Sequence, residues 1–232
     1  MASSRRVLDL YFDVISPYTW IGFEILCRYK PVWNIQMQFR PAFLGGIMKA
    51  TGNSPPVTIP KKGIYLQSDI VRLGKFCKVP FHFPADFFDV ITKGTLSAQR
   101  FLTALEIVHE KNGGIGNSPL LESLSRQFWI RIWSRDEDIT KLDSLTAAAK
   151  EAGLTPTMIA QLTALHETSE VKERLKKVTN DAIENGAFGM PWLVVHLPGS
   201  PSFSLFGSDR MELLADLLGE KWYGPVPPSP KM

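Results

Sequence analysis

The chain has 232 residues, of which 44% are hydrophobic, and its 26 Lys and Arg exceed its 23 Asp and Glu by a formal net charge of +3. A globular chain of this length buries roughly 70 to 75% of its unfolded surface, so it needs no disulfide or metal for stability. So small a net charge argues against nucleic-acid binding. No segment approaches the roughly 18 consecutive apolar residues of a membrane span, and only Met1 to Arg6 precede the first patterned segment, too few for a secretory signal. We therefore expect a soluble intracellular protein that neither binds nucleic acid nor spans a membrane.

The first forty residues predict a β-α-β unit. Apolar and polar side chains alternate over residues 7–13, which is the pattern of a strand. Ser16 and Pro17 then make a favourable helix start, and Pro31 should end that helix. Alternation resumes over residues 35–40, which predicts a second strand parallel to the first.

A block of helices is predicted after residues 42–60, a Gly- and Pro-rich segment that we expect to form a long functional loop. Apolar residues recur at helical spacing in residues 64–76, 96–109, 119–133, 142–152, 156–166 and 170–183. The pattern then returns to strands at residues 192–197 and 202–206, which flank a turn and predict a hairpin. Ser208 should cap a last helix over residues 209–218.

This element order, β-α-β, helices, then β-β-α, is that of a thioredoxin fold with an insertion, an α/β architecture. We expect residues 1–60 and 185–232 to form a thioredoxin-like domain. Residues 61–184 would then form an all-helical domain inserted between its two halves.

Ser16 lies where a thioredoxin fold carries its reactive thiol, between a strand and the N-terminus of a helix. Backbone N–H groups and the helix dipole favour an anion at that position. No cysteine stands there, and Cys27 and Cys77 form no Cys-x-x-Cys pair, which argues against a dithiol oxidoreductase. A serine hydroxyl can instead donate a hydrogen bond to the thiolate of a bound thiol. It can equally serve only as the helix N-cap, and the local sequence leaves both open.

Two further segments carry candidate binding groups. Met190-Pro191 precedes an apolar strand, where a cis bond would expose backbone groups to an extended ligand and a trans bond would make an ordinary turn. Ser208 and Asp209 stand at another helix N-terminus, where the carboxylate either accepts a ligand ammonium group or caps the helix. The histidines lack metal-ligand spacing, so we expect no metal site. The apolar stripe between Phe128 and Trp133 is typical of core, with a pocket wall or an interface as alternatives.

Short runs spread over nearly the whole chain carry a family resemblance. They are residues 13–20 (DVISPYTW), 40–41 (RP), 60–63 (PKKG), 187–191 (AFGMP), 206–214 (FGSDRMELL) and 219–222 (GEKW). Together they resemble the kappa-class glutathione transferases. The resemblance implies a DsbA-like thioredoxin domain interrupted by a helical domain. It also implies a detoxifying enzyme in which a serine hydroxyl stabilises the glutathione thiolate for attack on small hydrophobic electrophiles, with peroxide reduction as a second activity.

The resemblance also implies a glutathione site composed of Ser16, Pro17, Tyr18, Asn53, Lys62, Met190, Pro191, Ser208 and Asp209. In that site Ser16 would be the catalytic residue that holds the thiolate. Asn53 and Lys62 would bind the glycyl end of glutathione, with Lys62 pairing with the carboxylate. The backbone of Met190, before a cis proline, would bind the cysteinyl part, and residues 208–209 would bind the γ-glutamyl end.

Members of this family are dimeric and occur in mitochondria and peroxisomes, so the resemblance implies a homodimer in the mitochondrial matrix, the peroxisome or both. The sequence departs from the family at two places. Thr19 stands where the family has Ser, which is a conservative change. Pro230-Lys231-Met232 is a poor peroxisomal signal, which puts peroxisomal targeting in doubt.

Two alternatives to a transferase stay open. The 2-hydroxychromene-2-carboxylate isomerases share the fold and the Ser-Pro-Tyr element, and they use glutathione to isomerise an aromatic substrate. The runs SDRMEL and GEKW favour the transferase over this isomerase. The second alternative is a non-catalytic thioredoxin-like module that binds extended peptides at the edge next to Pro191.

Overall fold

The structure is a computed structural model that describes residues 6–228. Its sheet has the strands β1 (Arg6–Phe12), β2 (Ile35–Pro41), β3 (Trp192–His196) and β4 (Phe203–Phe206), in the order β2-β1-β3-β4. β1 runs parallel to β2, and β3 runs antiparallel to both β1 and β4. The predicted parallel pair and the predicted hairpin are thus confirmed, and with them the α/β thioredoxin-like class.

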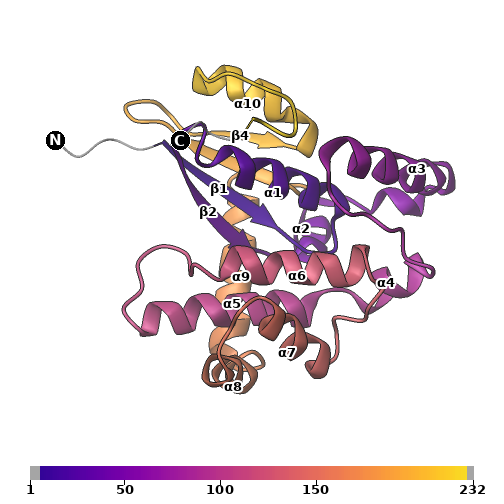
Figure 1. The fold of residues 1–232 in the computed structure, drawn as a ribbon, viewed down its shortest axis with the longest axis vertical. Coiled ribbons are helices and arrows are strands. Elements are labelled where there is room, and N and C mark those ends of the chain that lie inside the picture. The colour runs from indigo at the N-terminus through magenta and orange to yellow at the C-terminus, as the bar shows by residue number, and fades with distance from the viewer. Residues whose placement is uncertain (1–5, 229–232) are drawn as a thin grey trace.

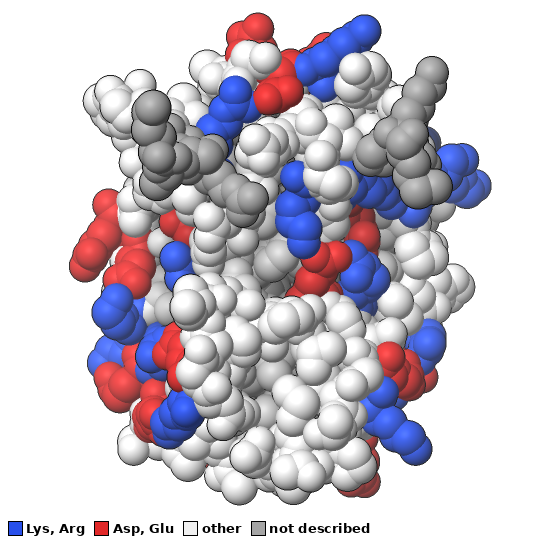
Figure 2. Space-filling model, turned by 60° about the vertical axis from the view of Figure 1, so that its left-hand side comes forward, with Lys and Arg blue, Asp and Glu red and all other residues white. Residues whose placement is uncertain are grey.

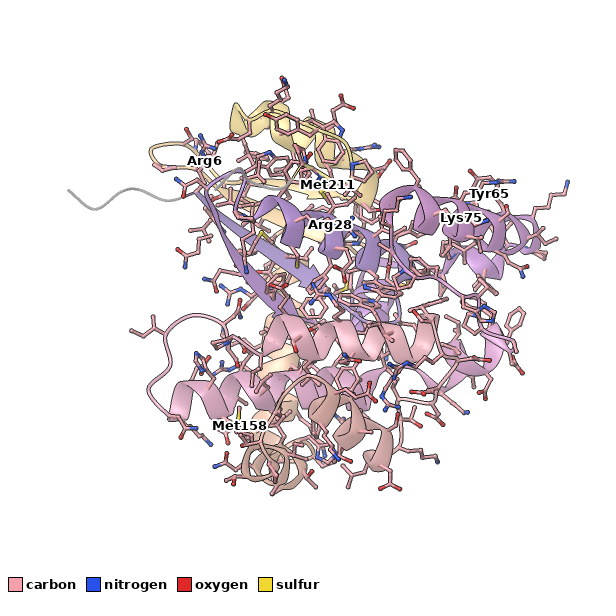
Figure 3. The ribbon with its side chains drawn as sticks, viewed as in Figure 1. Arg6, Arg28, Tyr65, Lys75, Met158 and Met211 are labelled. Atoms are coloured by element: carbon pink, nitrogen blue, oxygen red, sulfur yellow. The ribbon has the colours of Figure 1, made fainter. Side chains whose placement is uncertain are left out.

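Helices lie on both sides of this sheet (Figure 1). Toward one end of the molecule are α1 (Pro17–Tyr29) and α10 (Met211–Leu218), and Met211 packs against α1 near Gly22 (Figure 3). The other end is made by the block that the sequence predicted to be helical. Its helices are α5 (Leu96–Lys111), α6 (Leu121–Trp133), α7 (Leu142–Glu151), α8 (Pro156–Leu165) and α9 (Ser169–Glu184).

The expectation of a long loop over residues 42–60 is wrong. The segment contains α2 (Leu44–Thr51) and a 3-10 turn (Pro56–Thr58), and it leads into α3 (Pro60–Cys77). Glycines weaken helices, which is why Gly45 and Gly46 suggested a loop. They are tolerated because α2 packs closely against α9, where a Cβ on Gly46 would lie 3.2 Å from Cγ2 of Thr179.

The sequence analysis also missed α4 (Phe87–Lys93), a seven-residue helix. None of its residues is fully buried, so it lacks the sustained apolar face by which a helix is recognised in a sequence. Asp86 caps it by accepting a hydrogen bond from the backbone N–H of Asp89 at 2.9 Å.

The core runs through the sheet and the helical block without interruption. One cluster joins Leu8 and Leu10 of β1 to Phe128 and Trp129 of α6, all of them fully buried. The aromatic stripe is therefore core, as predicted. Because packing alone does not separate residues 61–184 from the rest, the proposed division into two domains stays a prediction.

Figure 2 shows acidic and basic side chains beside one another along the sides of one face, around a broad lower area without charged groups. No helix within residues 6–228 is long and apolar enough to cross a membrane. The proposed targeting residues 230–232 lie outside the described part of the chain.

Candidate active site

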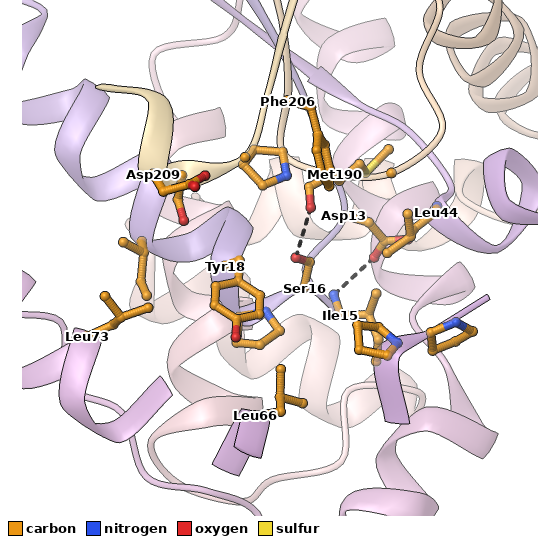
Figure 4. A pocket seen from close by; sticks show the side chains of 18 of the residues that line it. Asp13, Ile15, Ser16, Tyr18, Leu44, Leu66, Leu73, Met190, Phe206 and Asp209 are labelled. Atoms are coloured by element: carbon orange, nitrogen blue, oxygen red, sulfur yellow. Dashed lines mark hydrogen bonds between the residues drawn. The ribbon is translucent and has the colours of Figure 1, made fainter. Parts of the chain in front are cut away.

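A cavity of about 1060 Å³ opens beside the N-terminus of α1. Every residue proposed for the glutathione site lines it, namely Ser16, Pro17, Tyr18, Asn53, Lys62, Met190, Pro191, Ser208 and Asp209. The structure therefore brings the whole predicted set together from segments that are far apart in the sequence (Figure 4).

Ser16 is the N-cap of α1, and its side chain is 7% exposed. Its Oγ accepts a hydrogen bond from the backbone N–H of Thr19 at 3.1 Å. The hydroxyl points toward the carbonyl oxygen of Met190, 3.5 Å away, which is a long hydrogen bond (Figure 4). The N-cap fixes the position of the oxygen, while the hydroxyl proton stays free to turn to a better acceptor in the cavity.

Two buried indoles of α6 support the loop that carries Ser16. Trp129 Nε1 donates to the carbonyl oxygen of Ser16 at 3.3 Å, and Trp133 Nε1 donates to that of Val14 at 3.2 Å. The helical spacing of these tryptophans predicts that they lie in the core, but it does not predict that their N–H groups reach the site. A buried indole N–H needs an acceptor, and this requirement was the available signal.

Tyr18 is tied to a residue that the sequence analysis did not identify. Its phenolic oxygen donates a hydrogen bond to Asp69 Oδ2 on α3 at 2.7 Å. Burial and then the neighbouring Asp69 carboxylate raise the pKa of Tyr18, so the phenol stays protonated. Lys62, Leu66 and Asp69 all line the cavity from α3, and their i, i+4, i+7 spacing would have pointed to Asp69.

The loop before β3 holds a cis peptide bond between Met190 and Pro191, as the first of the two readings of this segment predicted. Asn53 Nδ2 donates to the carbonyl oxygen of Phe188 at 2.7 Å, so the segment that follows α2 is fastened to this loop. The carbonyl oxygen of Pro191 accepts a hydrogen bond from Gly207 N at 3.1 Å. These contacts fix the backbone around Met190 at the edge of the cavity.

Ser208 does not cap α10, contrary to the prediction. A 3-10 turn, Ser208–Arg210, intervenes, and α10 begins only at Met211. Asp209 Oδ2 instead accepts a hydrogen bond from Arg210 Nη1 at 2.6 Å. Its other oxygen lies over Gly207, where a Cβ would come within 2.4 Å and push the exposed carboxylate aside. Gly207 also has a φ of 101°, which favours glycine.

Charged and apolar side chains both line the cavity. Lys62 on α3 supplies a cation and Asp209 supplies a carboxylate. The apolar side chains of Leu66 and Leu73 lie on the same side of the cavity as Tyr18 (Figure 4). Within residues 6–228 no group of three or more His, Cys, Asp or Glu side chains gathers to hold a metal ion. A zwitterionic peptide joined to an apolar group would match this lining.

Comparison with known proteins places the chain in a family. Residues 7–219 match the model of the DSBA-like thioredoxin domain. The chain is 49% identical to human glutathione S-transferase kappa 1 over 230 residues, 99% of this chain and 98% of the human one. It belongs to the kappa-class glutathione S-transferases. The rat glutathione S-transferase kappa 1 is 48% identical over the same shares of the two chains.

Comparison with solved structures shows which proteins share the fold of this kappa-class chain. A 2-hydroxychromene-2-carboxylate isomerase superposes with a TM-score of 0.69 at 19% sequence identity, covering 92% of this chain and 94% of the isomerase. Identity this low shows a common fold. The family resemblance and the DsbA-like fold predicted from the sequence are thus both confirmed, and the chain belongs to a family of enzymes.

Proposed function

We propose that this kappa-class enzyme conjugates glutathione to small hydrophobic electrophiles, with Ser16 as the catalytic residue. The observation that carries the proposal is the position of the Ser16 hydroxyl. It lies in the wall of a large cavity, at the N-terminus of α1, with its oxygen held by Thr19 N–H. A hydroxyl donor at the positive end of a helix suits a thiolate.

The proposal gives glutathione one orientation in the cavity. Lys62 would pair with the glycyl carboxylate, assisted by the polar side chain of Asn53. The backbone at Met190 would bind the cysteinyl unit and place its sulfur near Ser16. Ser208 and the Asp209 carboxylate would take the γ-glutamyl end, whose ammonium group carries the opposite charge.

The energies suffice for the chemistry. A free thiol with a pKa near 8.5 is about 3% ionised at pH 7. A charge-assisted hydrogen bond from Ser16 contributes roughly 1.5 to 3 kcal/mol and a helix N-terminus about 0.3 to 1 kcal/mol. Together they would lower the thiol pKa by about 1.5 to 3 units, because one unit is about 1.4 kcal/mol. Most bound glutathione would then be thiolate at neutral pH.

The reaction begins when the thiol proton passes to solvent and Ser16 Oγ–H donates to the sulfur. The sulfur lone pair then attacks an electrophilic carbon and forms the C–S bond, while a leaving group departs with its bonding electrons. Leu66, Leu73 and Phe87 line the cavity and would hold the hydrophobic part of the second substrate. Peroxide reduction by the same thiolate is the second proposed activity.

Assembly and location follow the family in this proposal. We propose a homodimer that resides in the mitochondrial matrix, the peroxisome or both. Support for the dimer and for the location comes only from the family resemblance. Sedimentation of the purified protein and fractionation of organelles test these two statements.

The deciding experiment is an ultraviolet absorbance titration of glutathione bound to the purified protein and to Ser16→Ala, alongside conjugation of a chloronitrobenzene. We expect ionisation well below pH 8 in the wild type, and at least a tenfold loss of kcat/KM in the variant. Ser68→Ala on α3 is the matched hydroxyl control, because Ser68 is only partly buried and does not line the cavity. Full activity of Ser16→Ala would overturn the assigned role. Turnover of a hydroxychromene carboxylate without conjugation would favour the isomerase, and peptide binding without glutathione affinity would favour the binding module.

A further inference from the structure

A buried carboxylate, Asp13, lies directly beneath the loop that carries Ser16. Its side chain is fully buried, and donors from different segments bind it. Oδ1 accepts hydrogen bonds from Ile15 N at 3.1 Å and from Thr95 Oγ1 at 2.5 Å. Oδ2 accepts from Leu44 N at 2.9 Å. Figure 4 shows the bond from Ile15 to Asp13.

The same residue shapes the turn that ends at Ser16. The backbone N–H of Ser16 donates to the carbonyl oxygen of Asp13 at 3.1 Å, which closes the turn. The bond from Ile15 N to the carboxylate adds an Asx-type contact within that turn. Both ends of Asp13, backbone and side chain, therefore fix the direction in which the chain enters α1.

The carboxylate also ties this turn to two other helices. Leu44 is the first residue of α2, and Thr95 immediately precedes α5. Neither Phe43 nor Thr95 caps its helix with its own side chain. The Asp13 carboxylate instead accepts the first backbone N–H of α2, and it binds the hydroxyl of the residue that precedes α5. One buried group thereby holds the Ser16 turn against α2 and against the helical block.

No cation offsets this charge, since no salt bridge to Asp13 occurs among residues 6–228. Burial raises the pKa of Asp13, and the hydrogen bonds from Thr95, Leu44 and Ile15 oppose that rise. Helix N-termini also favour a carboxylate in this place. Burying an acid without an ion-pair partner costs free energy. Here the hydrogen bonds of the buried carboxylate hold three segments in fixed positions around the cavity.

We infer that Asp13 is a positioning residue for Ser16, which sets the hydroxyl at the distance and angle needed to hold the glutathione thiolate. This inference rests on the proposed function. A hydrogen bond to a thiolate weakens steeply with misalignment, so a small shift of the turn should appear in the pKa of the bound thiol.

If Asp13 acted on the thiolate only through its charge, Asp13→Asn would change the pKa of the bound thiol in the opposite direction. An ionised Asp13 near the thiolate repels it, so if charge alone mattered, Asp13→Asn would lower the thiol pKa. If Asp13 positions Ser16, the asparagine keeps one acceptor oxygen, but its NH2 group replaces the other and cannot accept the backbone N–H that faces it. The turn then shifts, and the thiol pKa rises. A purely structural role would change the unfolding temperature alone.

The test compares wild type, Asp13→Asn and Thr95→Val by absorbance titration of bound glutathione, by kcat and KM for glutathione between pH 6 and 9, and by thermal unfolding. For Asp13→Asn we expect a higher thiol pKa and about tenfold lower kcat at pH 7 that recovers as the pH rises, with a nearly unchanged KM. Thr95→Val should shift kcat the same way by about threefold. Thr103→Val, which removes a buried hydroxyl within α5 that does not contact Asp13, is the matched control.

If Asp13→Asn does not fold, Thr95→Val decides the question, because it removes one donor and leaves the carboxylate in place. A lowered thiol pKa, or an unchanged thiol pKa in the folded variants, would overturn the inference. Failure of the wild type to ionise glutathione would instead overturn the proposed function, so the two failures are distinguishable.

Discussion

Tyr18 on α1 donates a hydrogen bond to Asp69 on α3, with 2.7 Å between the phenolic oxygen and Oδ2. Both residues line the cavity, and the helices that carry them, α1 and α3, pack together. The bond therefore fastens α3, which carries Lys62, to the helix whose N-terminus holds Ser16.

We expect Tyr18→Phe to loosen this attachment and to raise the KM for glutathione about three- to tenfold, because a hydrogen bond to a charged acceptor contributes roughly 1.5 to 3 kcal/mol before solvent exposure reduces it. Asp69→Asn should do the same. Steady-state kinetics of both single variants and the double variant give the coupling between them. Strictly additive effects on KM would show that the bond is not the cause.

Lys62 and its neighbour Lys61 offer a matched pair for the glycyl end of glutathione. Both are exposed, but only Lys62 lines the cavity. We expect Lys62→Ala to raise the KM for glutathione about tenfold at low salt with little change in kcat, whereas Lys61→Ala should leave both unchanged. The difference should shrink at high ionic strength, since salt screens exposed charges. Equal effects of the two substitutions would point to net charge rather than to a contact.

The fold was largely predictable because period-two and helical patterns are local properties of the sequence. The strands β1 to β4 and the long helices follow such patterns, and Ser16-Pro17 marks the start of α1 as expected. The segment from Leu44 to Thr51 was not predictable in this way. Its helix depends on glycines that fit against Phe43 and Thr179, and such packing appears only when distant segments meet.

Most of the predicted site lies within the family runs, and Asn53, which lies outside them, was predicted from the same resemblance and also lines the cavity. Asp69 lies outside every run as well, and only its bond to Tyr18 reveals it. Trp129 was recognised as an apolar side chain, while its N–H bond to Ser16 is a tertiary contact. The cap predicted at Ser208 failed because a 3-10 turn can occupy the same kind of sequence as a first helical turn.

Because of Tyr11, the free energy of unfolding should depend on pH in the alkaline range. Burial, followed by the Asp9 carboxylate, raises the pKa of Tyr11 to about 12. The unfolded chain releases this phenolic proton near pH 10, whereas the folded protein retains it up to about pH 12. Unfolding therefore releases a proton in this window, and the free energy of unfolding should fall as the pH rises through it.

Urea unfolding between pH 8 and pH 11 measures this fall. Tyr11→Phe should make the decline shallower than in the wild type, because one phenol no longer ionises on unfolding. Tyr223→Phe, at a side chain that is 46% exposed, is the control for loss of a tyrosine. An unchanged slope in Tyr11→Phe would mean that other groups account for the alkaline loss.

Variants of Trp129 and Trp133 can distinguish a contribution to core stability from support of the loop that carries Ser16. Both indoles are fully buried on α6, but Trp129 Nε1 donates to Ser16 and Trp133 Nε1 donates to Val14. Substituting either by Phe removes buried volume and a hydrogen bond, and we expect each to lower the free energy of unfolding by about 1 to 3 kcal/mol. Calorimetry should then show a similar fall in unfolding temperature for both variants. Trp129→Phe should in addition lower kcat more than Trp133→Phe, because the carbonyl that loses its hydrogen bond is that of Ser16 itself. Equal kcat values would show that both indoles contribute only to the stability of the core.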